Sequence, residues 1–161
     1  MNGRVIGLDY GSRTVGVAVT DALGLTVQPL ETITRKEENK LRRTCARVEE
    51  IIKELGVTEI VVGLPLHLDG EESESSVKAR AFGEMLSRRT GLPVYYQDER
   101  LTTVEADEIL SETGIPVKDR KTYIDAVAAS LILEDFLSER ALREEDRRLT
   151  GSPEKEAEDE E

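Results

Sequence analysis

The sequence lacks several features that are typical of secreted proteins, of proteins with structural zinc sites and of membrane proteins. It contains one cysteine, Cys45, and no tryptophan. A single cysteine excludes an internal disulfide and a cysteine-based zinc site. No apolar run is long enough to span a membrane, and the N-terminus MNGRVIGLDYG leads into a strand-like segment without the layout of a signal peptide. We therefore expect a cytoplasmic protein that does not associate with membranes.

The sequence also has fewer basic residues than acidic residues. The chain has 22 lysines and arginines against 34 aspartates and glutamates, a net charge of −12. The segment 151–161 alone has one lysine against six acids and almost no apolar residues, a composition typical of disorder. We expect one domain over residues 1–140 and a charged, disordered tail over 141–161. The acidic balance of the rest argues against avid, nonspecific binding of nucleic acids. It leaves room for a local basic patch or a site that holds cations.

Apolar residues are present in regular patterns that predict an α/β domain. Three strand-like segments come first, and the first two are spaced to form a hairpin. Helical and strand-like patterns then alternate, followed by two helical patterns. The predicted strands are Arg4–Leu8, Thr14–Thr20, Leu25–Thr34, Thr58–Leu64 and Pro93–Gln97; the predicted helices end at Gly56, Gly91 and Gly114, and the last runs from about Ile124 to Arg140. This order predicts a five-stranded mixed sheet with helices on both faces.

Three carboxylates are predicted to meet at one edge of this sheet. Crossover connections make the first, fourth and fifth strands parallel, and ligands of open α/β sheets bind outside the carboxyl ends of such strands. Asp9 ends the first strand, and the pair Asp98-Glu99 follows the fifth. Asp125 lies in the first turn of the last predicted helix, where alanines allow close packing against the sheet.

Carboxylates at such an edge have two interpretations. Acids that converge repel one another and raise each other's pKa, and a hard divalent cation such as Mg²⁺ relieves that repulsion. Two such ions about 4 Å apart can clamp the attacking and leaving oxygens of a phosphodiester. Alternatively, Asp9 is a turn former, and Asp98, Glu99 and Asp125 are acids placed favourably at helix N-termini. The residues by themselves leave both interpretations open.

Four motifs resemble those of the YqgF family, also named RuvX. They are GLDYGSRTVGVAV (Gly7–Val19), IVVGLPLHLDG (Ile60–Gly70), DERLTTVEA (Asp98–Ala106) and DAVAASLIL (Asp125–Leu133), and the resemblance covers nearly all of residues 3–138. It implies a ribonuclease H-like fold and a metal-dependent nuclease that uses Mg²⁺ or Mn²⁺. It also implies a role in maturing the 5′ end of small-subunit rRNA, with junction cleavage proposed for some members.

The resemblance also implies which residues act. The acidic triad of the family falls on Asp9, Glu99 and Asp125, with Asp9 shared between two ions and an ion-activated water as the nucleophile. Asp98 is the weaker candidate, because adjacent side chains of an extended strand point to opposite faces. The basic residues Arg13, Arg100 and Lys121 are the candidate contacts to substrate phosphates; an exposed surface position or an ion pair explains them equally well.

The acidic composition is unusual for a nuclease. Substrate binding is therefore expected to depend on a few basic residues, on the metal ions, or on a ribosomal partner such as a pre-ribosomal subunit. One stretch, from Arg35 to Arg47, is rich in lysine and arginine and is a candidate patch, although Glu37 and Glu38 weaken it.

Other functions remain compatible with the sequence. Cleavage of branched DNA as a Holliday junction resolvase requires two active sites and hence a dimer, whereas trimming of an rRNA precursor needs only a monomer. The turn after the first strand resembles the phosphate-binding turn of the actin and Hsp70 group, but those proteins bind ATP between two such domains and this chain supplies one. A non-catalytic nucleic-acid-binding module is the remaining alternative.

Overall fold

A computed structural model describes residues 3–99, 108–109, 111–112 and 117–150, with the backbone alone for 117–122. Five strands form one sheet in the order β3-β2-β1-β4-β5. The strands are β1 (Arg4–Tyr10), β2 (Thr14–Thr20), β3 (Val27–Thr34), β4 (Val57–Leu64) and β5 (Val94–Asp98). The helices are α1 (Arg42–Leu55), α2 (Glu74–Thr90) and α4 (Val117–Thr150).

The sheet is mixed, as the element order predicts. β1 pairs antiparallel with β2, and β2 pairs antiparallel with β3. β1 pairs parallel with β4, and β4 with β5. The three parallel strands therefore end along one side of the sheet, which we call the carboxyl edge. Pairing continues one residue beyond β5, where the Glu99 amide donates to the Leu64 carbonyl at 3.1 Å, so Glu99 is held at this edge.

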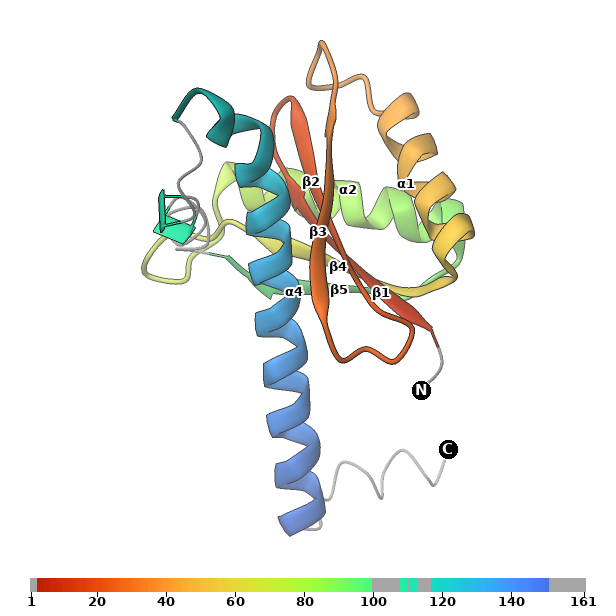
Figure 1. Cartoon of the computed structure of the whole chain (residues 1–161), viewed down its shortest axis with the longest axis vertical. Coiled ribbons are helices and arrows are strands. Elements are labelled where there is room, and N and C mark those ends of the chain that lie inside the picture. The colour runs from red at the N-terminus through yellow and green to blue at the C-terminus, as the bar shows by residue number, and fades with distance from the viewer. Residues whose placement is uncertain (1–2, 100–107, 110, 113–116, 151–161) are drawn as a thin grey trace.

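Helices cover the two faces of the sheet unequally. α1 and α2 lie on one face and α4 lies on the other (Figure 1). Side chains alternate along β1, so that Ile6 and Leu8 join the larger core beneath α1 and α2, while Val5 joins a smaller core beneath α4. Asp9 has the same parity as Val5. It therefore lies on the α4 face.

Local sequence explains where α1 and α2 stop. Gly56 and Gly91 follow these helices with φ of 67° and 74°, a left-handed conformation that glycine adopts without steric cost. At the start of α2, the Ser73 hydroxyl accepts from the Ser76 amide in a capping box. Both predicted helix ends are confirmed.

The last helix is longer than the sequence pattern predicts. The expected helix from Ile124 to Arg140 is the middle of α4, which begins at Val117 and continues to Thr150, past the end of the sheet (Figure 1). Residues 141–150, expected to belong to a disordered tail, are therefore helical. Glycine and proline are absent from this stretch, and an ion pair from Arg148 to Glu145 at 3.2 Å supports its last turns.

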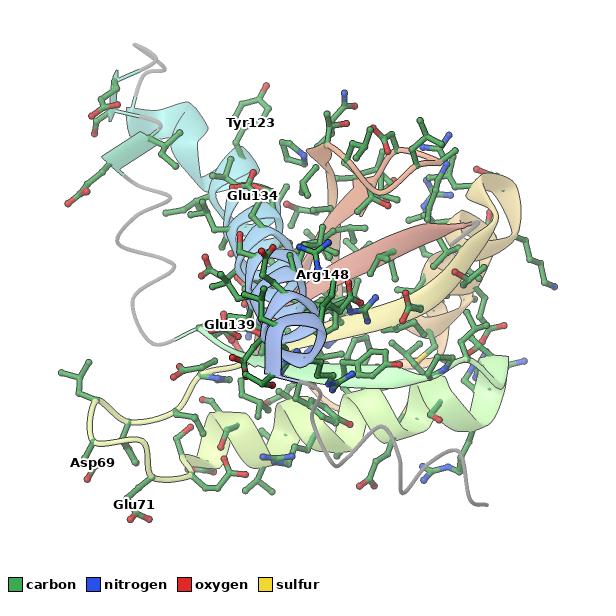
Figure 2. All side chains as sticks on the ribbon, turned by 90° about the horizontal axis from the view of Figure 1, so that it is seen from below. Asp69, Glu71, Tyr123, Glu134, Glu139 and Arg148 are labelled. Atoms are coloured by element: carbon green, nitrogen blue, oxygen red, sulfur yellow. The ribbon has the colours of Figure 1, made fainter. Side chains whose placement is uncertain are left out.

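The outer side of α4 is charged, and Glu134, Glu139 and Arg148 project from it in Figure 2. In the described ranges, neither α4 nor another helix is apolar enough over a sufficient length to cross a bilayer. Of the helix predicted to end at Gly114, residues 108–109 and 111–112 are helical, and Gly114 itself lies outside the described residues.

Candidate active site

Asp9 of β1 and Glu99, the residue after β5, form a hydrogen-bonded carboxyl pair at the carboxyl edge. Glu99 is only 7% exposed. Burial raises the pKa of Glu99 far above its ordinary value, and the neighbouring charge of Asp9 raises it further. Burial likewise raises the pKa of Asp9. A hydrogen bond between two carboxyl groups requires a proton, so the pair without a cation retains a proton that isolated acids would have lost.

Asp125 is the third acid of this group. Its charge adds to the burial that raises the pKa of Asp9. Its backbone is placed by Gly16 of β2, which is the register partner of Asp9 in the β1–β2 ladder. A Cβ at Gly16 would lie 1.9 Å from the Asp125 carbonyl oxygen. The missing side chain at Gly16 therefore lets α4 rest directly on the hairpin, beside Asp9.

Gly63 of β4 makes the corresponding space for Glu99. A Cβ there would lie 2.9 Å from Cδ of Glu99 and 2.5 Å from Cδ1 of Ile132 in α4.

The sequence interpretation missed the role of Gly16. Its signal was a glycine inside a strand pattern, which often marks a close approach of another backbone.

The alternation of β5 separates the two adjacent acids. The Tyr95 ring packs 5.3 Å from the Phe136 ring of α4, whereas the Tyr96 hydroxyl donates to the Arg80 carbonyl of α2. Glu99 has the parity of Tyr95 and lies on the α4 face with Asp9, while Asp98 has the parity of Tyr96. The structure therefore brings Glu99, and not Asp98, to Asp9.

The chemistry of this donor set suits a hard divalent cation. Within the described residues no group of three or more His, Cys, Asp or Glu side chains is close enough to hold a metal ion. Two carboxyl groups in contact and a third acting through its charge nevertheless match Mg²⁺ or Mn²⁺, because Mg²⁺ takes few protein ligands and completes its shell with water and phosphate. Burial and, second to it, the neighbouring acidic charges raise the pKa of both groups, and a bound cation would favour their ionised forms. The fit is therefore good.

The basic residues expected to contact substrate fall in different parts of the structure. Arg13 lies in the turn between β1 and β2 at the carboxyl edge, and its side chain is exposed. Arg100 lies outside the described residues, and Lys121 is described only by its backbone in α4. Their contacts to substrate stay predictions.

The carboxyl pair predicts how the stability of the metal-free protein depends on pH. Unfolded carboxyls ionise near pH 4, whereas Glu99 keeps its proton to higher pH in the folded state. Above about pH 4, unfolding therefore releases the proton of Glu99. The free energy of unfolding consequently falls as the pH rises toward neutrality. We expect Glu99→Gln to reduce this fall, measured as the midpoint of thermal unfolding between pH 5 and 8 in a chelator. An equal slope in wild type and variant would contradict the assignment.

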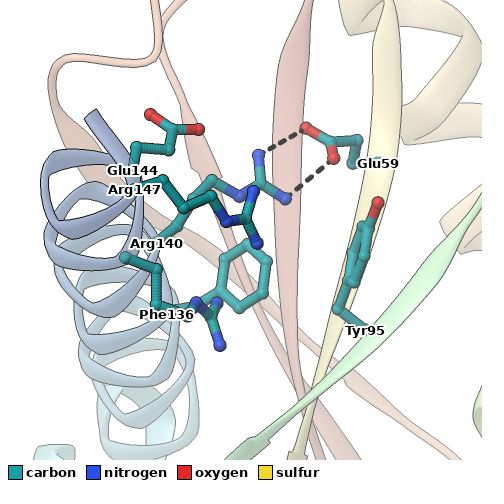
Figure 3. A pocket seen from close by; sticks show the side chains of 7 residues that line it. Glu59, Tyr95, Phe136, Arg140, Glu144 and Arg147 are labelled. Carbon is teal, nitrogen blue, oxygen red and sulfur yellow. Dashed lines mark hydrogen bonds and ion pairs between the residues drawn. The ribbon is translucent and has the colours of Figure 1, made fainter. Parts of the chain in front are cut away.

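A cavity of about 500 Å³ lies away from the carboxyl edge, at the end of the sheet where β4 and β5 begin (Figure 3). Its central residue, Arg140 of α4, forms a two-pronged ion pair with the buried Glu59 of β4, with N···O distances of 3.0 and 2.8 Å. The same guanidinium lies 4.5 Å from the Phe136 ring centroid. Arg140 is thus fully engaged, and it anchors α4 to the sheet at the end away from Asp125.

The chain is similar to known proteins over most of its length. A family model described as "RuvX: Holliday junction resolvase" matches residues 3–139. A Lachnospira eligens protein named "Putative pre-16S rRNA nuclease" is 58% identical over 134 residues, covering 83% of this chain and 96% of that protein. A Koribacter versatilis protein of the same name is 42% identical over 91% of this chain and 94% of its own length.

Solved structures share the fold, and one of them illustrates the likeness. This structure, "T. thermophilus RuvC in complex with Holliday junction substrate", aligns with a TM-score of 0.56 over 86% of this chain and 96% of that one. Its sequence is 18% identical, so the likeness concerns the fold alone. With the observed sheet order, it confirms the predicted ribonuclease H-like architecture.

Proposed function

Because this chain belongs to the RuvX family, we propose that it is a metal-dependent nuclease that hydrolyses phosphodiester bonds in the 5′ extension of pre-16S rRNA. The observation that carries the proposal is the buried Asp9–Glu99 pair with Asp125 beside it at the carboxyl edge. Relatives with 42–58% identity over most of the chain carry the corresponding name. A pre-ribosomal substrate would place this activity in the cytoplasm.

The three acids would have distinct roles. Asp9 interacts with both Glu99 and Asp125, so it is the carboxylate best placed to be shared by two ions. Glu99 is held by its backbone hydrogen bond to Leu64 and by the space at Gly63, which orients its carboxylate toward Asp9. Bound divalent ions would lower the pKa of the attacking water and neutralise charge on the scissile phosphate.

A second candidate function is cleavage of four-way DNA junctions, favoured by the description of the family model. It would require two copies of the site acting on opposed strands, and therefore a dimer. Trimming of an rRNA extension would proceed with one copy. Oligomeric state and substrate therefore have to be tested together.

The test compares two labelled substrates with the purified protein. One is a pre-16S rRNA carrying its 5′ extension, free and within a precursor of the small subunit; the other is a four-way DNA junction. In Mg²⁺ or Mn²⁺ we expect the RNA to be shortened and the junction to stay intact, and a chelator should stop the reaction. Cleavage of the junction alone would establish the second candidate. Failure to cut the RNA in either form would refute the first.

A further inference from the structure

A basic cavity lies between the end of β3 and the start of α1, and the nuclease chemistry above does not use it. Its volume is about 680 Å³. Five basic residues and one acid line it together with Thr34; they are Arg35, Lys36, Lys40, Arg42, Arg43 and Glu37. In a chain with a net charge of −12, such a concentration of positive charge indicates an anionic ligand.

The cavity is tied to the hairpin that carries Asp9. The Arg35 amide donates to the Arg13 carbonyl at 2.8 Å, and Nη2 of Arg35 donates to the Gly11 carbonyl at 2.6 Å. Gly11 lies two residues after Asp9. The basic cavity therefore adjoins the carboxyl edge, at the β1–β2 turn.

The positive charge of Arg35 is not neutralised by a salt bridge within the described residues. Its guanidinium donates to backbone carbonyls, those of Gly11 and Glu38, and lies 4.8 Å from the Tyr10 ring centroid. Its third nitrogen, Nη1, is buried without a hydrogen-bond partner in the described structure, which is costly for a charged group. The Glu38 carboxylate is bound by Lys78 at 2.8 Å, and the charge of Arg35 is the smallest of the influences that lower the pKa of Glu38. No carboxylate of the described residues forms a salt bridge with Arg35, so an anion in the cavity that this residue lines would lie beside a positive charge that is not neutralised.

The start of α1 adds to the same field. Arg42 and Arg43 occupy its first turn, which contains no acid, and the cap residue Leu41 makes no side-chain capping bond. Two cations at the positive end of a helix dipole are unfavourable unless an anion lies between them and the free amides. Both side chains are exposed, and neither has an ion-pair partner where the chain is described.

The rest of the basic stretch is less available. Arg47 is bound by Glu31 at 2.6 Å, and Lys40 lies 3.7 Å from Glu37. Among the described residues that line the cavity, the positive charges without a salt bridge are thus those of Arg35, Lys36, Arg42 and Arg43. The side chains that line the cavity include no aromatic ring on which a base could stack, whereas arginine forks match phosphate oxygens.

We propose that the basic cavity binds phosphates of the nucleic-acid strand whose cleavage takes place at Asp9. The inference rests on the proposed nuclease function and adds the place where the substrate backbone is held. Phosphate is common to RNA and DNA, so the cavity supplies position and affinity and leaves the choice of strand to other contacts.

Binding is tested with Arg42→Ala/Arg43→Ala in an Asp9→Asn background, which keeps the strand intact. Labelled single strands of RNA and DNA with one sequence are titrated by fluorescence anisotropy at several salt concentrations. We expect binding of both to weaken by about tenfold, and the slope of log Kd against log salt to fall by about 1.4, since each lost contact to a single strand removes about 0.7. A loss with only one of the strands would contradict a contact made through phosphates, which both strands share.

Arg143→Ala/Arg147→Ala, in the same background, is the matched control, because it removes two exposed arginines from the far end of α4. Its Kd should stay within about twofold of the parent. Equal losses in the two double variants, or no loss in either, would overturn the inference. Lys36→Glu, outside any helix, must weaken binding too, which guards against a local defect of α1.

The two proposals fail differently. If Arg42→Ala/Arg43→Ala with native Asp9 cleaves RNA at an unchanged KM, the cavity is not the substrate contact although the nuclease function holds. If binding depends on the cavity but the wild-type protein cuts nothing, the nuclease function fails and the binding site stands.

Discussion

Asp9→Asn is expected to reduce cleavage of the pre-16S rRNA extension by about a thousandfold or more, equivalent to roughly 4 kcal/mol of transition-state stabilisation. Asp9 is the acid that interacts with both Glu99 and Asp125. The substitution removes its negative charge and replaces one carboxylate oxygen by an amide nitrogen, a group that does not bind a hard cation. Initial rates at saturating Mg²⁺, with substrate above KM, measure the effect on kcat.

Asp98→Asn is the matched control for this variant. It removes the same charge one residue from Glu99, but on the opposite face of β5, so cleavage should stay within a few-fold of wild type. Misfolding does not explain the expected loss in Asp9→Asn, because burial already disfavours the charged form of Asp9; its metal-free thermal midpoint at neutral pH should be equal or higher. Equal inactivation by both substitutions would place the metal site elsewhere.

Gly16→Ala is expected to destabilise the fold by about 3 kcal/mol and to lower cleavage by the molecules that remain folded. The added Cβ would lie 1.9 Å from the carbonyl oxygen and 2.2 Å from the carbonyl carbon of Asp125. These are helix backbone atoms, which cannot rotate away as a side chain does. α4 would have to lift from β2, carrying Asp125 away from Asp9 and opening the core around Ala18 and Ala129.

Urea unfolding followed by circular dichroism measures the stability of this variant, and single-turnover cleavage at low temperature measures its chemistry. Gly11→Ala, in the turn of the same hairpin, adds the same methyl group where the nearest atoms, in Thr14, lie 3.2 Å away, so its effect on stability should be much smaller. Binding through the basic cavity, which does not involve α4, should be retained in Gly16→Ala. Unchanged stability in Gly16→Ala would show that α4 does not depend on this contact.

Much of the fold could be predicted because its elements are specified locally. Apolar runs of period two marked the strands, and glycines at 56 and 91 marked two helix ends that the left-handed φ values confirm. The last helix was underestimated, because the charged residues after Arg140 have the composition of a solvated tail and also good helix propensity. Composition favoured the tail, and the backbone of α4 continues to Thr150.

By itself, the sequence determined that Asp9 and Glu99 stand at the ends of parallel strands, since this follows from the order of strands and crossovers. Tertiary structure alone decided that their carboxyl groups touch, that Gly16 admits the backbone of Asp125, and that Arg35 bonds the turn after Asp9. Each of these contacts joins segments far apart in the chain. Whether they form depends on how closely the helices and strands pack, to within a few tenths of an ångström. No local pattern of residues encodes this fit.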